Sequence, residues 1–307
     1  MKIAIIGLGK MGQALAYRAI KVGHTVYGFD VNQHADFIEE MKNIGIIFLH
    51  TLQDLSQHDI DFFWLMVPQG PIVDKVIEQL CLFAKPKTII IDGGNSKFTD
   101  SMCRAQTLTA RDIFFLDCGT SGGVHGRENG FCLMVGGDKK AYETISSALI
   151  SVAAPDGCAY IGPSGTGHYV KMVHNGIEYG LLQAYAEGFD LLKNGEFKKE
   201  HLDLEKIAYL WNHGSVIRSW ILELVHDVMK EDQDLKNIAG TVAVTGMGAW
   251  TVERAHMSGI PVPVIEQALK VRLESEKTGG NYGTKVVAML RNQFGGHAVA
   301  KLKEDVE

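Results

Sequence analysis

The sequence predicts an α/β protein: a doubly wound parallel sheet followed by an all-helical C-terminal domain. In the first half, short apolar runs alternate with amphipathic stretches, and this alternation favours parallel strands joined by right-handed helical crossovers. From Ile161 to Gly167 the chain is rich in turn residues, and beyond this stretch strand-like runs almost disappear. We therefore expect two domains, residues 1–163 and residues 164–307.

The apolar runs of the first half are predicted to be strands, and the amphipathic stretches between them are predicted to be helices. The predicted strands are Lys2–Ile6, Thr25–Phe29, Asp61–Val67, Thr88–Ile91, Ile113–Leu116 and Phe131–Val135. The predicted helices are Met11–Val22, Ala35–Asn43, Ile72–Phe83, Thr99–Ala110 and Lys140–Ile150. The strands are apolar throughout rather than alternating, which is typical of a sheet that helices cover on both faces.

The second half is predicted to be helical. Its longest pattern runs from His168 to Lys193 and ends at Asn194-Gly195, a common form of helix C-terminus. Further helices are predicted at Asp203–Trp211, Ser219–Met229, Ala249–Met257, Val264–Ser275 and Asn281–Arg291. We expect this domain to be the substrate and oligomerisation domain. Because it is rich in long apolar helices, including Leu181–Leu192, we expect it to bury part of that surface against another subunit in a homodimer or homotetramer.

The composition excludes several classes of protein. The chain has 307 residues, is 46% hydrophobic and 21% charged, and carries a formal net charge of −6. Such a chain does not suit a nucleic-acid partner, because a phosphate backbone needs a basic surface. No apolar run approaches the roughly 20 residues of a membrane span, and a strand-like run begins at Lys2 with no signal-peptide pattern. Five cysteines without C-x-x-C spacing indicate reduced thiols, so we expect a cytoplasmic protein.

A glycine-rich turn follows the first predicted strand and opens the first predicted helix. It has the form G-x-G-x-x-G and consists of Gly7, Leu8, Gly9, Lys10, Met11 and Gly12. In a Rossmann-type domain these glycines make a tight turn, let the backbone approach a pyrophosphate and bring the helix close to the strand. The helix N-terminus adds N–H groups and a positive dipole end for the phosphates. FAD and S-adenosylmethionine proteins share parts of this pattern, so by itself it does not name the chemistry.

Asp30 is predicted to select between the nicotinamide cofactors. It ends the second predicted strand, 21 positions after Gly9. A carboxylate there accepts hydrogen bonds from the adenosine ribose hydroxyls and would repel a 2′-phosphate. The next three residues, Val31, Asn32 and Gln33, include no arginine, and we therefore predict NAD over NADP. Val67 and Pro68 come at the end of the predicted strand that begins at Asp61, where they either line the adenine or ribose side of the cofactor or form a simple turn.

Two further segments follow predicted strands and should emerge at the carboxyl edge of the sheet, where ligands bind. The first is Ile91–Ser96, in which the Asn95 amide can donate to a substrate oxygen or to the nicotinamide. The second is Gly119–Gly126, whose exposed N–H groups suit a carboxylate. The alternative for both segments is that their glycines only form turns.

The long predicted helix carries polar side chains at the spacings i, i+3, i+4 and i+7, which share one helix face. They are Lys171, His174, Asn175 and Glu178. Lys171 and Glu178 would lie roughly 10 Å apart along the axis, a separation that can bracket a small extended substrate. The alternative is a solvated surface pair, but the polar neighbours on the same face and Gly176 within the motif favour a site.

Several motifs together resemble one family. They are GLGKMG at Gly7–Gly12, IDGGNS at Ile91–Ser96, SGG at Ser121–Gly123, KMVHNGIEY at Lys171–Tyr179, IRS at Ile217–Ser219, and a tail R-x-x-F-G-x-H with Arg291, Phe294, Gly295 and His297. Over nearly its whole length the chain resembles the decarboxylating 6-phosphogluconate dehydrogenases in their shorter-chain form, which are β-hydroxyacid dehydrogenases. KMVHNGIEY is the most specific motif, because other β-hydroxyacid dehydrogenases keep the lysine and asparagine but usually not the rest.

The resemblance implies oxidative decarboxylation of 6-phosphogluconate to ribulose 5-phosphate with NAD as oxidant. It implies that Lys171 is the base at the C3 hydroxyl and later the acid toward the C3 oxygen, and that Glu178 supplies the C1 proton. Lys171 must then be neutral and Glu178 protonated, so each needs an environment that favours that form. The reaction needs no metal ion if Lys171 polarises the keto oxygen. The histidines also lack the spacing of zinc ligands, so we expect no metal cofactor.

The resemblance also implies which residues bind the phosphorylated sugar acid. Those that hold the acid are Asn95, Ser121, Gly122, Gly123, His174 and Asn175. Those that match positions near the phosphate end or the hydroxyl chain are Tyr179, Arg218, Arg291 and His297. A guanidinium suits phosphate because it binds bidentately, and the alternative for either arginine alone is a surface position. The sequence leaves open whether Arg291 and His297 serve their own site or a partner subunit's.

One segment departs from the family. Where its members usually carry G-x-G-[KR]-W-T, the segment Thr245–Thr251 reads TGMGAWT, so a phosphate contact is either missing or supplied elsewhere. The departure supports one alternative, a non-decarboxylating β-hydroxyacid dehydrogenase that acts on a small unphosphorylated acid; Glu178, Arg291 and His297 argue against it. A second alternative is an inactive dinucleotide-sensing module, and the presence of both Lys171 and Glu178 argues against that.

Overall fold

The computed structural model describes residues 1–244 and 246–302. The chain divides into two compact units, Met1–Lys171 and Met172–Glu307, and the division falls inside a long helix, α7 (Thr166–Asn194). The domain boundary expected from the sequence, between residues 163 and 164, lies just before this helix and stays a prediction. Each unit has hydrophobic cores of its own.

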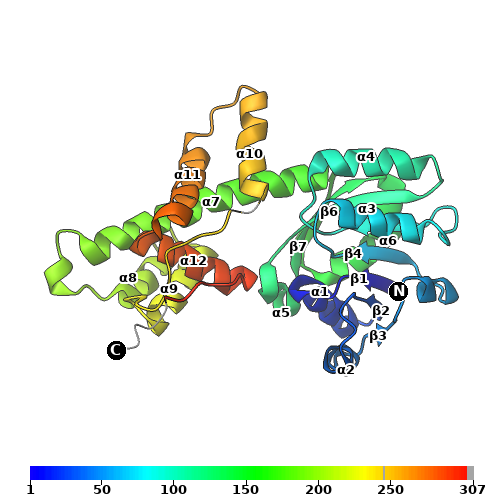
Figure 1. Ribbon diagram of the computed structural model, residues 1–307, viewed down its shortest axis with the longest axis horizontal. Coiled ribbons are helices and arrows are strands. Elements are labelled where there is room, and N and C mark those ends of the chain that lie inside the picture. The colour runs from blue at the N-terminus through cyan, green and yellow to red at the C-terminus, as the bar shows by residue number, and fades with distance from the viewer. Residues whose placement is uncertain (245, 303–307) are drawn as a thin grey trace. The chain divides into compact units, whose positions relative to one another are not determined.

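Unit 1 is built on an eight-stranded sheet with the strand order β3-β2-β1-β4-β5-β6-β7-β8 (Figure 1). The strands are β1 Lys2–Ile6, β2 Thr25–Phe29, β3 Ile47–Phe48, β4 Phe62–Leu65, β5 Ile89–Asp92, β6 Phe114–Ser121, β7 Phe131–Gly137 and β8 Ala153–Gly162. All neighbours pair in parallel except β6 and β7, which are antiparallel. The winding reverses between β1 and β4, which is where sheets of this kind bind their ligands.

Helices cover both faces of this sheet. They are α1 Lys10–Lys21, α2 Ala35–Ile44, α3 Pro71–Leu80, α4 Phe98–Thr109, α5 Gly126–Asn129 and α6 Lys139–Val152, with the 3-10 turns η1 Gln53–Gln57 and η2 Gly123–His125. Ile3 and Ile5 of β1 belong to a core shared with α1 and α6, whereas Ala4 and Ile6 belong to a core shared with α3. Successive strand residues point to opposite faces, so the two cores confirm the predicted doubly wound α/β fold.

The strand prediction was incomplete in two places and wrong in one. β3 has only two residues, which is too short to leave a pattern. β8 contains Pro155 and the turn-like pair Asp156-Gly157, and Asp156 has φ +57°, so the apolar run that marks the other strands is missing. Uniformly parallel pairing was wrong for β6 and β7. The Gly122–Gly130 connection between them is too short for a parallel crossover, which needs about a dozen residues or more.

Unit 2 is helical over its described residues, as predicted, apart from one isolated bridge between Ile238 and Lys301. Its helices are the second part of α7, then α8 Leu204–Asn212, α9 Trp220–Glu231, α10 Gly246–Met257, α11 Pro263–Thr278 and α12 Tyr282–Gly295, with the 3-10 turn η3 Lys198–Glu200. Helices α7, α8, α9 and α12 share its core. Asp203, Ser219 and Asn281 begin three of these helices by accepting N-cap hydrogen bonds.

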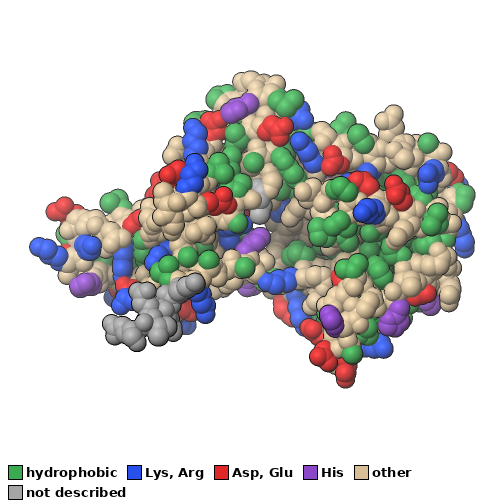
Figure 2. Space-filling view, in the orientation of Figure 1, with side chains coloured by type: hydrophobic (Ala, Val, Ile, Leu, Met, Phe, Trp, Pro, Cys, Tyr) green, Lys and Arg blue, Asp and Glu red, His purple; other side chains and the backbone are tan. Residues whose placement is uncertain are grey.

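The surface mixes charges of both signs. Lys and Arg side chains are interspersed with Asp and Glu over the faces of both units that are visible in Figure 2. No helix in residues 1–244 and 246–302 is both long and apolar enough to cross a membrane.

Candidate active site

The glycine-rich turn between β1 and α1 is packed tightly against the neighbouring chain. Gly7 has φ +93°, and a Cβ there would lie 2.7 Å from the Met66 carbonyl oxygen. A Cβ at Gly12 would lie 2.0 Å from the Gly7 oxygen, whereas a Cβ at Gly9 would meet nothing within 4 Å. Gly7 and Gly12 are therefore required by the fold, and Gly9 leaves open space in front of the turn.

The N-terminus of α1 is suited to an anion. Gly9 is its N-cap and contributes no side-chain hydrogen bond, and the first turn, which begins with Lys10 and Met11, contains no acidic residue. The first N–H groups of a helix lack intrahelical partners and lie at the positive end of its dipole. This arrangement fits a pyrophosphate, as the sequence motif predicts.

Asp30 follows β2 and is hydrogen-bonded to the glycine-rich turn. Its Oδ2 accepts from the Leu8 N–H at 2.6 Å, and its Oδ1 accepts from the Asn32 N–H at 2.8 Å. The Gln33 amide donates to the Asp30 carbonyl oxygen at 2.6 Å. A carboxylate fixed by two backbone donors still has lone pairs for ribose hydroxyls, and its negative charge would repel a 2′-phosphate.

The loops after β4 and β5 pack closely on each other. Val67 and Pro68 follow β4, and Asn95, which is exposed, follows β5. A Cβ at Gly94 would lie 2.9 Å from the Val67 carbonyl oxygen, and a Cβ at Gly7 would lie 2.9 Å from the Val67 side chain. Predicted cofactor residues from three loops of unit 1 therefore lie together at the carboxyl edge of the sheet.

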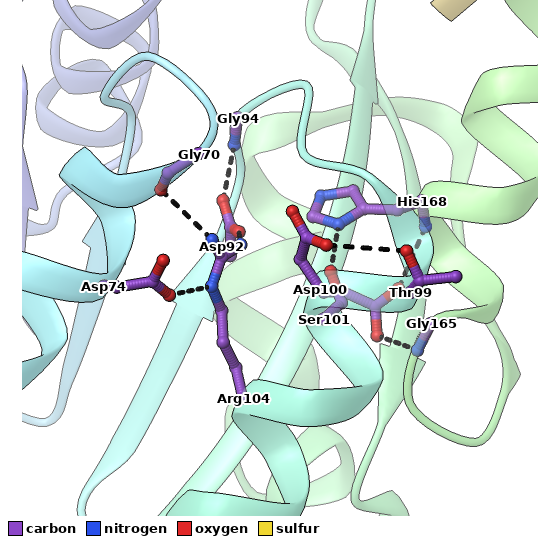
Figure 3. Close-up of polar contacts among 11 residues, drawn as sticks. Gly70, Asp74, Asp92, Gly94, Thr99, Asp100, Ser101, Arg104, Gly165 and His168 are labelled. Atoms are coloured by element: carbon purple, nitrogen blue, oxygen red, sulfur yellow. Dashed lines mark hydrogen bonds and ion pairs between the residues drawn. The ribbon is translucent and has the colours of Figure 1, made fainter. Parts of the chain in front are cut away.

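A buried arginine joins the loop after β4 to the end of β5 (Figure 3). Arg104 of α4 donates from Nε to Asp74 at 2.7 Å and from Nη1 to Asp92 at 3.1 Å. Its Nη2 donates to the Gly70 carbonyl oxygen at 3.2 Å, and Asp92 also accepts from the Gly94 N–H at 3.2 Å. Burial disfavours the charge of Arg104, but the carboxylates of Asp74 and Asp92 outweigh burial and raise the Arg104 pKa.

Lys171 is buried in the part of α7 that belongs to unit 1. It passes so close to Gly119 of β6 that a Cβ on this glycine would lie 2.5 Å from the Lys171 Cβ. The start of α7 is held by Asp117 of β6, whose carboxylate accepts from the N–H groups of Gly165 and His168 at 2.7 and 2.9 Å. β6 therefore positions Lys171 in two ways, through close backbone approach and through Asp117.

The loop predicted to bind a carboxylate begins where β6 ends. Ser121 is the last residue of β6, and Gly122 and Gly123 follow with φ values of +120° and +56°. Both values favour glycine, because other residues would be strained there. Because β6 runs parallel to β5, this loop emerges at the same edge of the sheet as the loop that carries Asn95.

In unit 2, α7 continues with the second half of the predicted motif. His174 Nδ1 and Asn175 Oδ1 are 2.9 Å apart. A Cβ at Gly176 would lie 2.6 Å from the Thr251 side chain, and the Thr251 hydroxyl donates to the Met172 carbonyl oxygen at 2.7 Å. Gly176 therefore allows α10 to approach α7 closely, which is a structural reason for the glycine in this motif.

Tyr179 lies in a buried cationic cluster of unit 2. The Arg272 guanidinium of α11 is 3.3 Å from the centroid of the Tyr179 ring, and both side chains are 2% exposed. Arg291 of α12 is 7% exposed, and its charge and that of Glu178 both act on Arg272. A Cβ at Gly248 would lie 2.4 Å from the Tyr179 ring, so this glycine makes room for the ring.

The guanidinium of Arg272 is not fully paired. Its Nη2 is buried and has no hydrogen-bond partner within the described chain. Burial and the nearby charge of Arg291 lower the Arg272 pKa to about 10, against the opposing influence of Tyr179 and Glu178. Burial lowers the pKa of Arg291 as well. Two desolvated cations with an unused donor favour a dianionic partner such as a phosphate.

Neither buried arginine, Arg104 or Arg272, was predicted from the sequence. Ser101 and Arg104 share the buried face of α4, and Ala268, Arg272 and Ser275 share that of α11. In each helix the arginine lies three or four positions from small residues, so that it shares their helix face. This spacing is the signal that could have identified the two arginines. Lysine and arginine residues on solvent-exposed helices occur at the same spacings from small residues. The spacing therefore identifies a buried arginine only when the burial of that helix face is known.

Other predicted residues lie elsewhere. Arg218 is exposed in the turn before α9, and the contacts of the described residues do not join it to the cluster around Tyr179. His297 is exposed after the end of α12. Thr245 lies outside the described residues, whereas Met247 is 3% exposed in α10, so its side chain contributes to packing. The roles proposed for Arg218 and His297 stay predictions.

Few of the described side chains are suited to bind a metal ion or to react as thiols. Among residues 1–244 and 246–302, no three His, Cys, Asp or Glu side chains are grouped so as to hold a metal ion. The five cysteines are free thiols. Burial raises the pKa of the Cys118 thiol, which keeps it protonated and unreactive.

Two family models match the chain, one over each half. The first describes the NAD binding domain of 6-phosphogluconate dehydrogenase and matches residues 2–162. The second describes the C-terminal domain of 6-phosphogluconate dehydrogenase and matches residues 167–305.

Individual relatives agree with these matches. A Haloferax volcanii protein named 6-phosphogluconate dehydrogenase, NAD(+)-dependent, decarboxylating, is 42% identical over 309 residues, covering 99% of this chain and 100% of that protein. A Synechococcus elongatus protein named 6-phosphogluconate dehydrogenase, decarboxylating, is 37% identical over 290 residues, covering 89% of this chain and 61% of that protein. The solved structure of Plasmodium falciparum 6-phosphogluconate dehydrogenase has a TM-score of 0.79 at 28% identity and covers 100% of this chain and 67% of that one. The chain therefore belongs to the 6-phosphogluconate dehydrogenase family.

Proposed function

We propose that this chain is an NAD-preferring enzyme that oxidises and decarboxylates 6-phosphogluconate to ribulose 5-phosphate. The observation that carries the proposal is Arg272, which is buried beside Tyr179 and Arg291 and has a terminal nitrogen without a partner among the described residues. A buried cation of this kind is costly unless an anion pairs with it. A phosphorylated substrate supplies that anion, whereas the small unphosphorylated acid of the alternative does not.

The two ends of the substrate are assigned to different groups. Arg272 and Arg291 bind the phosphate, and they replace the contact that the TGMGAWT segment lacks relative to the family. The Ser121–Gly123 loop binds the carboxylate through its N–H groups. The residues assigned to the hydroxyl groups are Asn95, His174 and Asn175.

The chemistry requires one base and one acid, which are assigned to α7. Bound NAD supplies the acceptor for the hydride from C3 of the substrate. Lys171 is buried against β6, and it takes the proton of the C3 hydroxyl as the 3-keto acid forms. As an ammonium it then donates to the keto oxygen, which receives the electron pair when the bond to the carboxylate breaks and CO₂ leaves.

The remaining step returns the enediol to a ketone. Lys171 gives its proton to the C3 oxygen, so that an enediol forms. Glu178 then protonates the carbon that becomes C1 of ribulose 5-phosphate, while Lys171 takes back the hydroxyl proton. Lys171 and Glu178 are seven positions apart on α7, so helical periodicity places them on one face.

The substrate and the reaction are tested by assaying NADH formation and CO₂ release together over a panel of acids. We expect equal amounts of both products from 6-phosphogluconate and no turnover of unphosphorylated 3-hydroxy acids. Oxidation without CO₂ would contradict decarboxylation, and no turnover of any acid would favour the dinucleotide-sensing alternative. Lys171→Ala should remove turnover; undiminished turnover would contradict the assigned base.

The preference for NAD is assigned to Asp30. Like charges placed together cost several kcal/mol, so we expect kcat/KM with NAD to exceed that with NADP by at least about tenfold. Asp30→Ala should reduce this ratio by weakening NAD more than NADP. Comparable kcat/KM for both cofactors in the unaltered protein would refute the assignment.

We also propose that the chain forms a homodimer or homotetramer through unit 2. Large apolar side chains exposed in this unit support the proposal; they include Leu191, Phe197, Tyr209, Leu210 and Val216. Light scattering tests it, and a monomer at micromolar concentration would contradict it. The proposed compartment is the cytoplasm, where free thiols stay reduced.

A further inference from the structure

Arg104 connects two loops that are predicted to line the cofactor (Figure 3). Its side chain is 6% exposed and lies on the buried face of α4. It contacts Asp92 at the end of β5 and Asp74 in the first turn of α3 at 3.1 and 2.7 Å. It also donates to the carbonyl oxygen of Gly70, in the loop after β4, at 3.2 Å. One guanidinium therefore joins the loop after β4 to the end of β5, and Asp92 continues the connection to the loop after β5 through the Gly94 N–H.

Close contacts continue from Arg104 to the glycine-rich turn. Asp92 accepts from the Gly94 N–H, and Gly94 is so close to the Val67 carbonyl oxygen that a Cβ would lie 2.9 Å from it. The side chain of Val67 lies 2.9 Å from the position of a Cβ at Gly7. Arg104 is thus linked through close contacts to all three loops.

These contacts require an arginine rather than any cation. A guanidinium offers five donors in a rigid planar fork, whereas a lysine ammonium is a point charge on a flexible stem. The Asp92 side chain is 1% exposed, so its carboxylate charge depends on Arg104 for stabilisation. The Asp74 side chain is 51% exposed, so water can stabilise its charge instead. The pair of Arg104 and Asp92 is therefore the buried centre of the network.

We propose that Arg104 is a positioning residue for the dinucleotide, which fixes the spacing between the loop of Val67 and Pro68 and the loop of Asn95. The inference rests on the proposed use of NAD. Arg104 acts on the cofactor only indirectly, through the loops that it holds. Sites held too loosely by their supporting contacts lose affinity and rate even when every contacting residue is present.

Two variants separate positioning from folding. Arg104→Lys keeps a positive charge beside Asp92 but loses the fork. The double variant Arg104→Met with Asp92→Asn removes both buried charges, and the new amide oxygen still accepts from the Gly94 N–H. Replacing a buried ion pair as a whole is often neutral for stability, so the double variant should fold. Arg104→Lys should fold because Asp92 keeps a cationic partner. Arg111→Met is the matched control, because Arg111 is an exposed arginine just beyond the end of α4.

The readouts are the Kd for NAD by calorimetry and the KM for NAD and kcat by steady-state assay. We expect both variants to raise the Kd and KM for NAD by about tenfold with a melting temperature near that of the unaltered protein, and the control to change neither. A merely structural residue would lower the active fraction, and so the apparent kcat, without changing KM. If both variants bind NAD within about twofold of the unaltered protein, the positioning role is refuted. If the unaltered protein itself fails to bind NAD, the proposed cofactor is wrong.

Discussion

The two buried arginines, Arg104 in unit 1 and Arg272 in unit 2, are placed in opposite electrostatic environments. Arg104 is 6% exposed and has two carboxylates and a carbonyl oxygen as acceptors, and its pKa is raised. Arg272 is 2% exposed, faces the Tyr179 ring and a second arginine, and its pKa is lowered. Burial of a charge is therefore not by itself a sign of function. A fully paired buried charge supports the fold, whereas one that is partly unpaired favours a ligand.

The largest expected effect is on stability, in unit 1. Arg104→Met leaves the carboxylate of Asp92 buried without its cation, which should lower the free energy of unfolding by about 3–5 kcal/mol. Urea denaturation measures this value. Arg111→Met is the control and should change the free energy by less than about 0.5 kcal/mol. A loss at Arg104 no larger than that of the control would remove the contrast between the two arginines.

The next effect is on activity, in unit 2. Arg272→Met should lower kcat/KM for 6-phosphogluconate at least about a hundredfold, or roughly 3 kcal/mol, because a charge-assisted phosphate contact is lost. The same change removes a buried charge that is only partly paired and keeps a side chain that packs on an aromatic ring. The free energy of unfolding should therefore stay the same or rise. Destabilisation as large as that of Arg104→Met would mean that Arg272, too, is a paired charge that stabilises the fold.

Stabilisation by bound 6-phosphogluconate should also distinguish Arg272 from Arg104. A concentration of 6-phosphogluconate of about 100 times Kd should raise the free energy of unfolding by about 2.7 kcal/mol. At the same concentration we expect no such gain in Arg272→Met and an undiminished gain in Arg104→Lys. Thermal unfolding with and without the ligand measures both. An equal gain in Arg272→Met would place the phosphate at some other group.

The smallest effect concerns the exposed partner of Arg104. Asp74 is 51% exposed, and ion pairs with exposed partners contribute little. Asp74→Asn should therefore lower the free energy of unfolding by less than about 1 kcal/mol, well below the effect of Arg104→Met. Equal losses at the two positions would show that the pairing with Asp92 is not the main contribution.

Much of the fold could be predicted, because its signals are local. Six apolar runs correspond to strands of the sheet, and the helical patterns of the second half correspond to helices. The strands that were predicted incorrectly, or not at all, are those whose conformation or direction depends on pairing with residues distant in the sequence. β8 contains Pro155 and the Asp156-Gly157 pair, and its strand conformation depends on β7 as a neighbour. The antiparallel direction of β7 followed from the length of one connection rather than from any residue pattern.

The candidate site was predictable to the extent that its chemistry lies in contiguous motifs. Gly7 to Gly12 and Lys171 to Tyr179 are short segments whose spacing alone indicates a phosphate turn and a polar helix face. Arg272 could not be found in this way, because α11 is distant in sequence from Tyr179 and only the packing of the two helices brings the guanidinium onto the ring. Arg218, which was inferred from a motif, is exposed, and its role stays a prediction.

The sequence by itself determined where a dinucleotide, a base and an acid would be sought, because turn geometry and helical periodicity act over a few residues. It also determined the family, through motifs spread over nearly the whole chain. Only the tertiary structure decided which charges are paired. Pairing depends on which side chains are buried together, and Arg104 and Arg272 acquired their different environments only when α4 packed beside the ends of β4 and β5 and α11 packed against α7.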